Sequence, residues 1–235
     1  MKESLYKPVP VLLALILWSA PGSSQAGELQ LETHFSGQHS YDPTFDALQS
    51  PDVWISSTVG LSYGVGEHLG VPGLDAYIGV SDAGAGRQRF DGDYRFDWHR
   101  TMYLLGAEFG YDLTNWFRPF IRVTGGLARH RFSVLPVGSR KYSEAQSDFV
   151  TRDSFNLEFH TPFATGEDDS ALAMSDFVRL GVTLGVGYTW QTAAEYDELK
   201  ASGGSSDWEE TGIDIGTLDA NDWFWSVGAT LRLRL

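Results

Sequence analysis

The residues of this chain that could do chemistry are its histidines, carboxylates and arginines, and their spacing decides what that chemistry is. The six histidines stand at positions 34, 39, 68, 99, 130 and 160. A histidine beside a hydroxyl, as in His160-Thr161, could serve acyl transfer, with the imidazole removing a proton from the nucleophile. The sequence has no H-E-x-x-H motif, no zinc-ligand cluster and no cysteine. We therefore predict that the protein is not an enzyme and holds no metal or cofactor.

The arginines of the last segment lie in a strictly alternating pattern. From Trp223 to Leu235, one face carries Trp223, Trp225 and five aliphatic residues, whereas the other carries Arg232 and Arg234. Successive side chains of a β-strand point to opposite faces. The segment has 13 residues, which exceeds the ~5–6 of an ordinary soluble strand and suits the ~9–11 of a strand that spans a bilayer. The pattern predicts a strand with lipid on one side and a polar interior on the other.

The same alternation recurs along the chain. Seven further segments show it: residues 29–35, 53–66, 74–80, 101–113, 118–128, 154–163 and 178–190. Their polar faces are rich in Gly, Ser and Thr, which suit a narrow barrel interior. With the terminal segment they make eight strands, and bacterial single-chain barrels have even strand numbers. We predict an all-β fold, a transmembrane antiparallel up-and-down β-barrel of eight strands.

The N-terminal segment predicts export. Two lysines in the first seven residues, an apolar run from Val9 to Ala20 and Ser24-Gln25-Ala26 follow the layout of a secretory signal peptide. We predict a signal peptide at 1–26 and a barrel domain at 27–235. A short N-terminal membrane anchor is the alternative, although the apolar run is well below the ~20 residues of a spanning helix.

The predicted connections differ in length at the two ends of the barrel. Residues 66–73 and 114–116 form short turns, and 164–174 a longer one, on the periplasmic side where both termini lie. The opposite side carries 37–52, 82–97, 133–148 and 191–222. The last of these is strongly acidic, so we interpret it as a solvated loop, or alternatively as a cation-mediated contact with lipopolysaccharide phosphates. The mature net charge of −15 argues against nucleic acid as a partner.

Charged residues on the inward faces form the predicted site. They are the carboxylates Glu28, Glu32, Asp75, Glu108, Asp112 and Glu158 and the arginines Arg118, Arg122, Arg179, Arg232 and Arg234. An eight-stranded interior is just wide enough for its own side chains, and buried charges need partners. We predict a salt-bridged, closed lumen, with a narrow porin-like channel lined by the same residues as the alternative.

Aromatic residues gather at one end of the last two predicted strands. They are Tyr188, Trp190, Trp223 and Trp225, and we predict that they form an aromatic girdle at the membrane interface. A soluble periplasmic β-sandwich or a lipocalin-like binder would instead distribute its aromatics through a core. The soluble protein is therefore the alternative class.

These segments together carry a resemblance to a known family. The signal peptide, the eight alternating segments, the stretch RPFIRVTGG (118–126) and the aromatic-rich terminal segment resemble the small outer-membrane barrels of the OmpA-like and opacity-protein type. The resemblance implies an outer-membrane location in a Gram-negative bacterium, with lipids and lipopolysaccharide as surroundings and a structural or surface-interaction role. It also implies that the barrel-assembly machinery recognises the terminal strand, where Leu235 replaces the usual aromatic residue. Some barrels of this size modify lipid A, which makes a lipid A-modifying enzyme a further alternative.

Overall fold

The computed structural model describes residues 27–40, 53–90, 94–114, 116–136, 142–161, 178–196, 200–201 and 216–234. The described elements are one short helix, α3 (Gly66–Leu69), and eleven strands. The strands are β1 (Glu28–Ser40), β2 (Val53–Gly64), β3 (Leu74–Phe90), β4 (Tyr94–Gly110), β5 (Phe117–Pro136), β6 (Tyr142–His160), β7 (Val178–Gln191), β8 (Ala194–Tyr196), β9 (Lys200–Ala201), β10 (Gly216–Leu218) and β11 (Asp222–Arg234). The predicted signal peptide, the predicted turn 164–174 and Leu235 lie outside the described residues.

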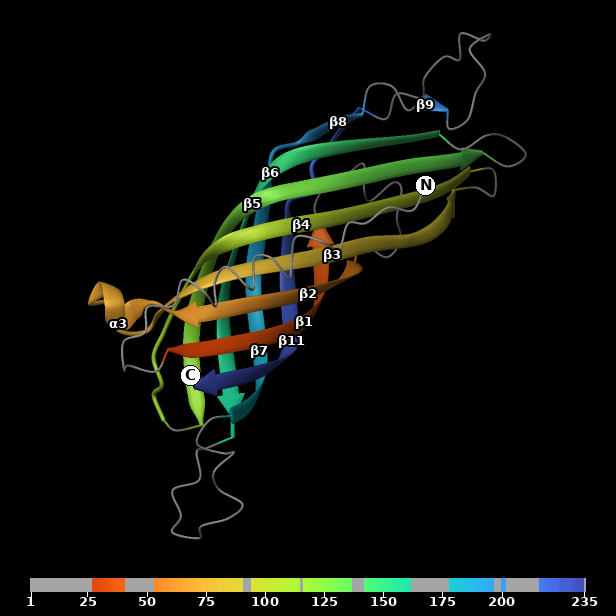
Figure 1. The fold of residues 1–235 in the computed structure, drawn as a ribbon. Helices are drawn as coiled ribbons and strands as arrows, with labels where there is room; N and C mark the ends of the chain where they lie inside the picture. Colours follow the sequence, from red (N-terminus) through yellow and green to blue (C-terminus); the bar gives the residue numbers. More distant parts are fainter. Residues whose placement is uncertain are drawn as a thin grey trace, which may run out of the picture.

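The long strands close into a ring. Neighbours in the sequence pair antiparallel from β1 to β7, β7 pairs with β11, and β11 returns to β1. The predicted all-β, eight-stranded antiparallel barrel is therefore confirmed (Figure 1). The short strands add to one end: β8 pairs with β10, and β9 pairs with the beginning of β6.

The strand register fixes the stagger of the barrel. From Phe35 on β1, the paired residues through β2, β3 and β4 lead to Arg129 on β5. In the opposite direction, through β11, β7 and β6, they lead to Pro119 on the same strand. The shear is thus ten residues over eight strands, which at ordinary strand spacing tilts the strands by about 40°. Each residue then climbs about 2.5 Å along the barrel axis.

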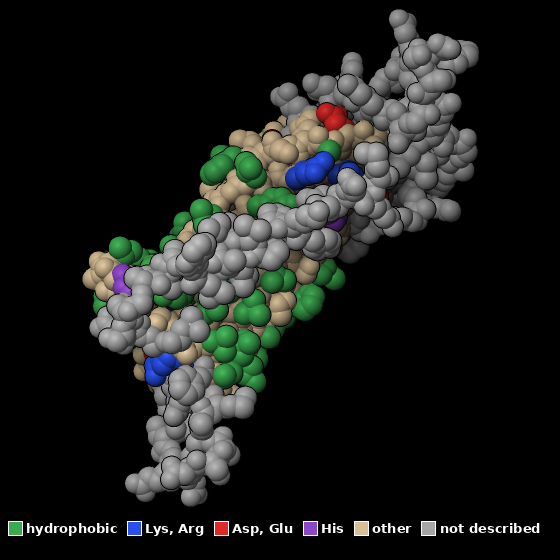
Figure 2. Space-filling model, viewed as in Figure 1, with side chains coloured by type: hydrophobic (Ala, Val, Ile, Leu, Met, Phe, Trp, Pro, Cys, Tyr) green, Lys and Arg blue, Asp and Glu red, His purple; other side chains and the backbone are tan. Residues whose placement is uncertain are grey.

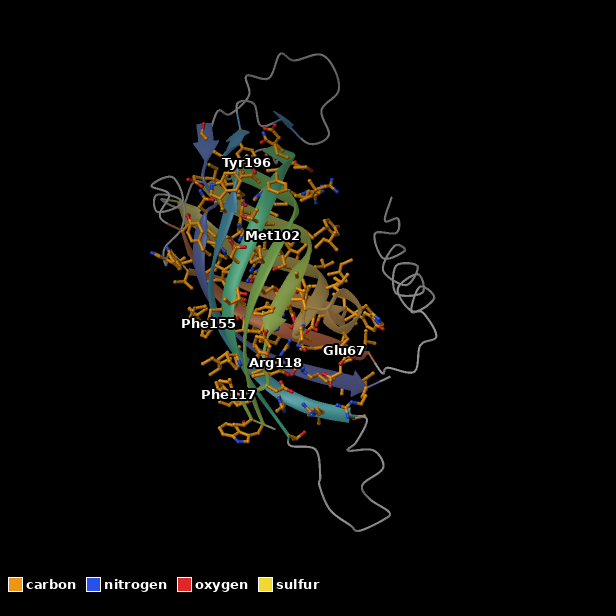
Figure 3. All side chains as sticks on the ribbon, turned by 90° about the vertical axis from the view of Figure 1, so that its left-hand side faces the viewer. Glu67, Met102, Phe117, Arg118, Phe155 and Tyr196 are labelled. Carbon is orange, nitrogen blue, oxygen red and sulfur yellow. The ribbon has the colours of Figure 1, made fainter. Side chains whose placement is uncertain are left out.

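The two faces of each strand meet different surroundings. In β1, Gln30, Glu32 and His34 are buried, whereas Leu31 and Phe35 are exposed. On the face shown in Figure 2, hydrophobic side chains gather on the outer wall of the barrel, and those of Phe117 and Phe155 project from its wall (Figure 3). Within the described residues no helix is long and apolar enough to cross a membrane.

Five strands, β1 and β3 to β6, extend further toward one end of the barrel than the alternation predicts. We predicted loops at 82–97 and 133–148, and this prediction is wrong. The pairing of β3 with β4 continues through most of 82–97, and the pairing of β5 with β6 continues through most of 133–148. The prediction for 37–52 is also partly wrong, since β1 continues to Ser40. The strands rise beyond the rest of the wall at the end opposite α3 (Figure 1).

The short turns lie together at the end of the barrel that carries Glu28 and Arg234. The predicted turn at 66–73 holds the helix α3 and ends at Gly73, whose φ is +81°. The carbonyl of Gly73 accepts a hydrogen bond of 3.0 Å from the amide of Gly110. The predicted turn at 114–116 is confirmed by the bridge between Thr114 and Phe117. In bacterial single-chain barrels the short turns lie on the periplasmic side, so we call this the periplasmic end.

Candidate functional site

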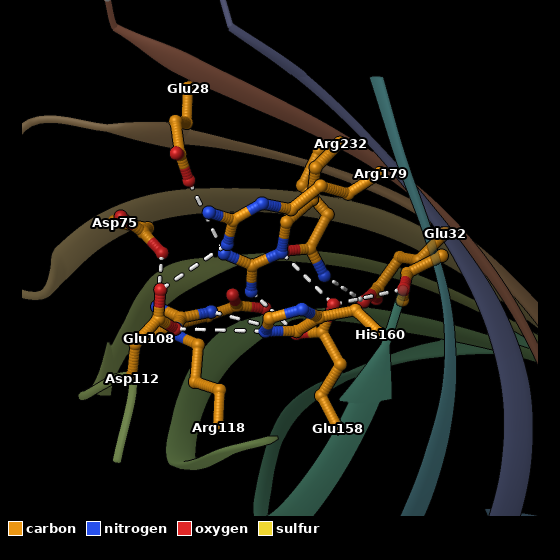
Figure 4. A network of polar contacts seen from close by, with 12 residues as sticks. Glu28, Glu32, Asp75, Glu108, Asp112, Arg118, Glu158, His160, Arg179 and Arg232 are labelled. Carbon is orange, nitrogen blue, oxygen red and sulfur yellow. Dashed lines mark hydrogen bonds and ion pairs between the residues drawn. The ribbon is translucent and has the colours of Figure 1, made fainter. Parts of the chain in front are cut away.

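The interior of the barrel holds the charged residues, and Glu158 lies at the centre of one cluster (Figure 4). Arg232 binds Glu158 with two parallel bonds, Nε to Oε1 at 2.9 Å and Nη2 to Oε2 at 2.5 Å. The hydroxyl of Thr230 donates to the same Oε1 at 3.0 Å. Arg118 lies 3.9 Å from Glu158 and binds Asp75 at 2.6 Å. A bidentate guanidinium–carboxylate pair is the strongest ionic geometry available to these side chains.

A second cluster occupies the middle of the lumen. Arg122 lies between two buried carboxylates: its Nη2 is 2.5 Å from Glu32, and its Nε donates to Glu108 at 2.7 Å. Its guanidinium stacks over the ring of Tyr77 at 4.1 Å. His34 contacts Glu32 at 3.0 Å. The guanidinium of Arg122 on β5 thus crosses the lumen to Glu32 on the opposite strand β1, while it also binds Glu108 on the neighbouring strand β4.

Water reaches the periplasmic mouth of the lumen. Glu28 lies 3.4 Å from Arg232 and 3.6 Å from Arg234, whose side chain is 49% exposed. Arg179 contacts Asp112 at 3.4 Å. Asp112 follows the end of β4 and is 43% exposed, so it belongs to the rim and not to a strand. All eleven charged residues that the sequence singles out therefore point inward or line this mouth, and Figure 4 labels all of them except Arg122 and Arg234.

Two further arginines lie deeper in the lumen, toward the other end. Arg100 is fully buried, binds Asp222 at 2.6 Å and donates to Gln38 at 2.9 Å. Arg152 donates to the hydroxyls of Ser81 and Ser36 at 3.1 and 3.2 Å. Its guanidinium also stacks over Phe224 at 3.9 Å. Neither arginine belongs to the site that the sequence predicts, because the alternating segments begin just after them, at residues 101 and 154.

The strand register explains how the charges meet. Glu108 is the direct partner of Arg122 across β4 and β5, and Arg118 is the direct partner of Glu158 across β5 and β6. Opposite charges facing each other on neighbouring strands stabilise the pairing. Arg232 instead faces Arg179 across β11 and β7. That like-charge pair is relieved because Arg232 reaches Glu158, one strand further along.

Little space remains between these side chains. A cavity lined by Arg122, Arg152, Tyr77 and small polar residues has a volume of about 20 Å³ open to the centre of a water molecule, which is room for about one water. The mouth beside Glu28 and Arg234 opens into a larger hollow of about 310 Å³. Among the described residues no group of three or more His, Asp or Glu side chains could hold a metal ion.

Two short motifs that contain serine could indicate a catalytic nucleophile, and the structure decides whether either is accessible. Gly60 to Gly64 reads G-x-S-x-G, but it lies within β2 and lacks the strand-turn-helix of a nucleophile elbow. His34 and Ser36 are two residues apart, and both face the packed lumen, 4% and 2% exposed. Neither serine is open to lipid or to a substrate-sized cavity.

The outer surface carries aromatic residues at two levels. Trp190, Trp223 and Trp225 face outward, and Tyr188 contacts Trp223 with ring centres 5.0 Å apart. A second group, unnoticed in the sequence, surrounds the turn at 114–116. Its members Trp116, Phe117, Phe159, Phe109 and Tyr111 contact one another in pairs. One carboxylate, Asp153, also faces outward, between Val123 and Tyr188.

The outer face of β11, from Leu233 to Trp223, covers eleven residues, a band about 25 Å tall at this tilt, as in membrane-spanning barrels. A closed ring, this outward band and a polar interior define the class of transmembrane eight-stranded β-barrels of the outer-membrane type.

Solved structures of such barrels are similar to the chain. They include neisserial surface protein A, with 12% identity and a TM-score of 0.45, covering 89% of this chain and 97% of that one. Ail of Yersinia pestis, solved with the heparin analogue sucrose octasulfate, has 8% identity and a TM-score of 0.44, covering 89% of this chain and 99% of that one. The N-terminal barrel of Pseudomonas aeruginosa OprF has 10% identity and a TM-score of 0.40, covering 87% and 97%. No family model matches the chain, and no curated protein matches its sequence.

Proposed function

We propose that the protein is an integral outer-membrane protein with a closed lumen and a structural or surface-interaction role. Residues 1–26 are its cleaved signal peptide, and residues 27–235 are the barrel domain. The terminal strand β11 is the segment that the barrel-assembly machinery recognises. The long ends of β3 to β6 face the outside of the cell and supply the contact surface.

The packing of the lumen carries this proposal. Arg122 bridges Glu32 and Glu108 across the middle of the barrel, with room for about one water beside it. The pair of Arg232 with Glu158 lies between that level and the periplasmic mouth. An ion would have to separate both sets of paired charges to pass, which is costly in a confined interior.

Planar-bilayer conductance of the purified, refolded protein tests the closed lumen. We expect no steady single-channel steps, while heat-modifiable gel migration of the same preparation verifies that the barrel has formed. Steady steps whose ion selectivity changes in Arg232→Ala would establish the narrow channel instead. In cells the protein should fractionate with outer membranes, and recovery from the soluble periplasmic fraction would support the soluble binder.

The surface role fits the described geometry better than catalysis does. A lipid A-modifying enzyme needs its nucleophile and histidine at the lipid-facing surface. The closely spaced pair His34 and Ser36 faces the lumen instead, and His160 is likewise buried there. On the outer face, His99 and Thr101 both bind the carboxylate of Asp82, each at 2.9 Å, so Asp82 and not the imidazole accepts the hydroxyl proton of Thr101. We propose accordingly that the protein does not act on lipid A.

A further inference from the structure

Two arginines differ from most others in this structure because they face outward. Arg129 and Arg131 lie on β5 and face outward, two residues apart, and both are exposed. Most other arginines with described side chains are buried inside the barrel; these are Arg100, Arg118, Arg122, Arg152, Arg179 and Arg232. The whole chain carries 17 basic and 31 acidic residues, so two adjacent outward cations form a local exception to an acidic protein.

The neighbours of these two arginines leave their guanidinium groups available to bind an anion. Among the described residues, neither Arg129 nor Arg131 has a carboxylate within ion-pair distance. Their cross-strand partners on β4 are Thr101 and His99. The nearby carboxylate of Asp82 is already bound, 2.9 Å from His99 and accepting a hydrogen bond of 2.9 Å from Thr101. We name Arg129, Arg131, His99 and Thr101 the outer basic patch.

An apolar surface lies directly beneath this patch. Two residues below Arg129 on the same face is Leu127, which pairs with Tyr103 on β4 and Phe149 on β6. All three side chains are exposed. An amphiphilic ligand could therefore place its acyl chain against this apolar surface and its anionic group against the outer basic patch. Figure 2 shows basic side chains beyond the hydrophobic band, toward the end with the longest strands.

The stagger of the barrel sets the height of the patch relative to the membrane. Trp190 pairs with Thr151, which pairs with Gly125 on β5. Correcting for the tilt over two strands places Gly125 about 6 Å below Trp190, so Arg129 lies about 4 Å and Arg131 about 9 Å above it. Tryptophan marks the interface of a bilayer, and the polar headgroup layer extends roughly 5–8 Å beyond the hydrocarbon. Arg129 thus falls within the headgroup layer of the outward leaflet, and Arg131 lies at its outer edge, from which its long side chain reaches the same layer.

We infer that the outer basic patch binds the phosphate groups of lipid A in the outer leaflet, with the acyl chains against Leu127, Tyr103 and Phe149. The inference rests on the proposed outer-membrane location and goes further by naming the lipid and its site. Arginine suits this role because its planar donors match phosphate oxygens, often in pairs. The spacing of two residues on one strand face puts the two guanidinium groups side by side above one headgroup.

Lipid enrichment around the refolded barrel tests the inference. The protein is placed in phosphatidylcholine vesicles with a trace of fluorescent diphosphoryl lipid A, and energy transfer from the protein tryptophans reports how strongly the lipid is retained. Arg129→Gln with Arg131→Gln should weaken retention by about 25-fold, at about five-fold for each arginine. The matched pair Arg129→Lys with Arg131→Lys keeps the charge and should retain most of it.

The controls separate the site from the barrel and from other anions. Heat-modifiable migration shows that each variant has formed a barrel, so unchanged retention in the glutamine pair overturns the site and leaves the proposed function intact. Equal retention of a dephosphorylated lipid A by the natural protein also overturns it. Sucrose octasulfate added to the vesicles distinguishes a soluble polyanion site. If the arginines govern binding of this sulfated probe and not of lipid A, the patch binds a soluble polyanion and the lipid assignment is wrong.

Discussion

At the scale of single residues, the two arginines of the terminal strand have different surroundings. Arg232 is 6% exposed and holds Glu158 through two bonds, whereas Arg234 is half exposed and lies 3.6 Å from Glu28. A buried charge that loses its partner cannot turn to water. An exposed pair contributes little, since water replaces the missing partner. Position in the lumen therefore decides the importance of each arginine.

Arg232→Ala should lower the free energy of unfolding by roughly 3–5 kcal/mol, because it leaves the buried Glu158 uncompensated. Arg234→Ala should cost under about 1 kcal/mol, since its partner reaches the open mouth. Urea midpoints of the refolded proteins in lipid vesicles measure both changes. Equal losses for the two variants would contradict the bidentate pair as the cause.

A double substitution identifies the partner of Arg232. Adding Glu158→Gln to Arg232→Ala should recover part of the loss, because the orphaned charge disappears with it. Adding Glu108→Gln is the control, since Glu108 binds Arg122 instead, and its effect should add to that of Arg232→Ala. The alternation places both carboxylates on inward faces, so the sequence by itself does not choose between them.

At the scale of the strands, the sequence predicts the half of each strand that lies in the bilayer better than the half that extends beyond it. Where one face meets lipid and the other the lumen, the alternation is strong, as in 178–190, and it predicts both the strand and its faces. Above the bilayer the outward faces meet water, and aromatic side chains pack inward, with Trp98 against Trp54 and Phe132 against Tyr196. The pattern of the lower half, apolar outside and polar inside, is therefore not continued there. Asp82, His99 and Arg129 all lie on outward faces of continued strands. This is why the long ends of β3 to β6 were mistaken for loops and why the buried Arg100 and Arg152 were missed.

Adjacent residues of β7 test the two faces. Leu184 faces outward and pairs with Val227, near the middle of the apolar band, whereas Thr183 is buried in the lumen. Leu184→Arg should therefore destabilise the barrel by roughly 2–4 kcal/mol, the cost of a cation at the bilayer midplane. Thr183→Ala should be mild, because it removes only a small hydroxyl. Urea midpoints in vesicles give both values, and a reversed order would exchange the inside and outside assignments.

The turn between β2 and β3 offers a second test at this scale. Gly70 and Gly73 both have positive φ, at +70° and +81°. A Cβ on Gly73 would lie 2.2 Å from the carbonyl oxygen of Gly110, whereas one on Gly70 would have no atom within 4 Å. Gly73→Ala should thus cost about 2–3 kcal/mol, and Gly70→Ala about 1 kcal/mol, which is the backbone strain alone. If urea midpoints show equal losses, the contact between this turn and the end of β4 does not form in the bilayer.

At the scale of the whole molecule, closure of the barrel pairs both the backbone groups of its edge strands and the charges of its lumen. The pairing of β1 with β11 joins the two ends of the described chain along 13 residue pairs, from Glu28 with Arg234 to Ser40 with Asp222. Closure leaves no open sheet edge in the bilayer, where an unpaired backbone group costs several kcal/mol. It also brings Glu32 on β1 opposite Arg122 on β5, residues 90 positions apart in the sequence. The lumen charges can therefore pair as described only when the ring is closed.

A disulfide across this seam reports closure directly. Thr33 and Ala229 are paired residues on β1 and β11, and both face outward. Antiparallel partners have Cα atoms about 4.5–5.5 Å apart, within the range that a disulfide spans, and the natural sequence has no cysteine to compete. Thr33→Cys with Ala229→Cys should thus crosslink nearly completely on oxidation of the folded protein.

The matched control moves one cysteine by two residues along the outward face of β11. Val227 pairs with Phe35, so Thr33→Cys with Val227→Cys joins diagonal positions about 7–8 Å apart, and it should crosslink poorly. Non-reducing gels of the heated proteins measure the outcome, because a crosslink between residues 33 and 229 holds the unfolded chain in a loop that migrates faster. Efficient crosslinking of the diagonal pair would mean that the seam is shifted by two residues. Absence of both crosslinks in a heat-modifiable protein would mean that β1 and β11 do not close the barrel, and the charge pairing of the lumen would then need a different arrangement.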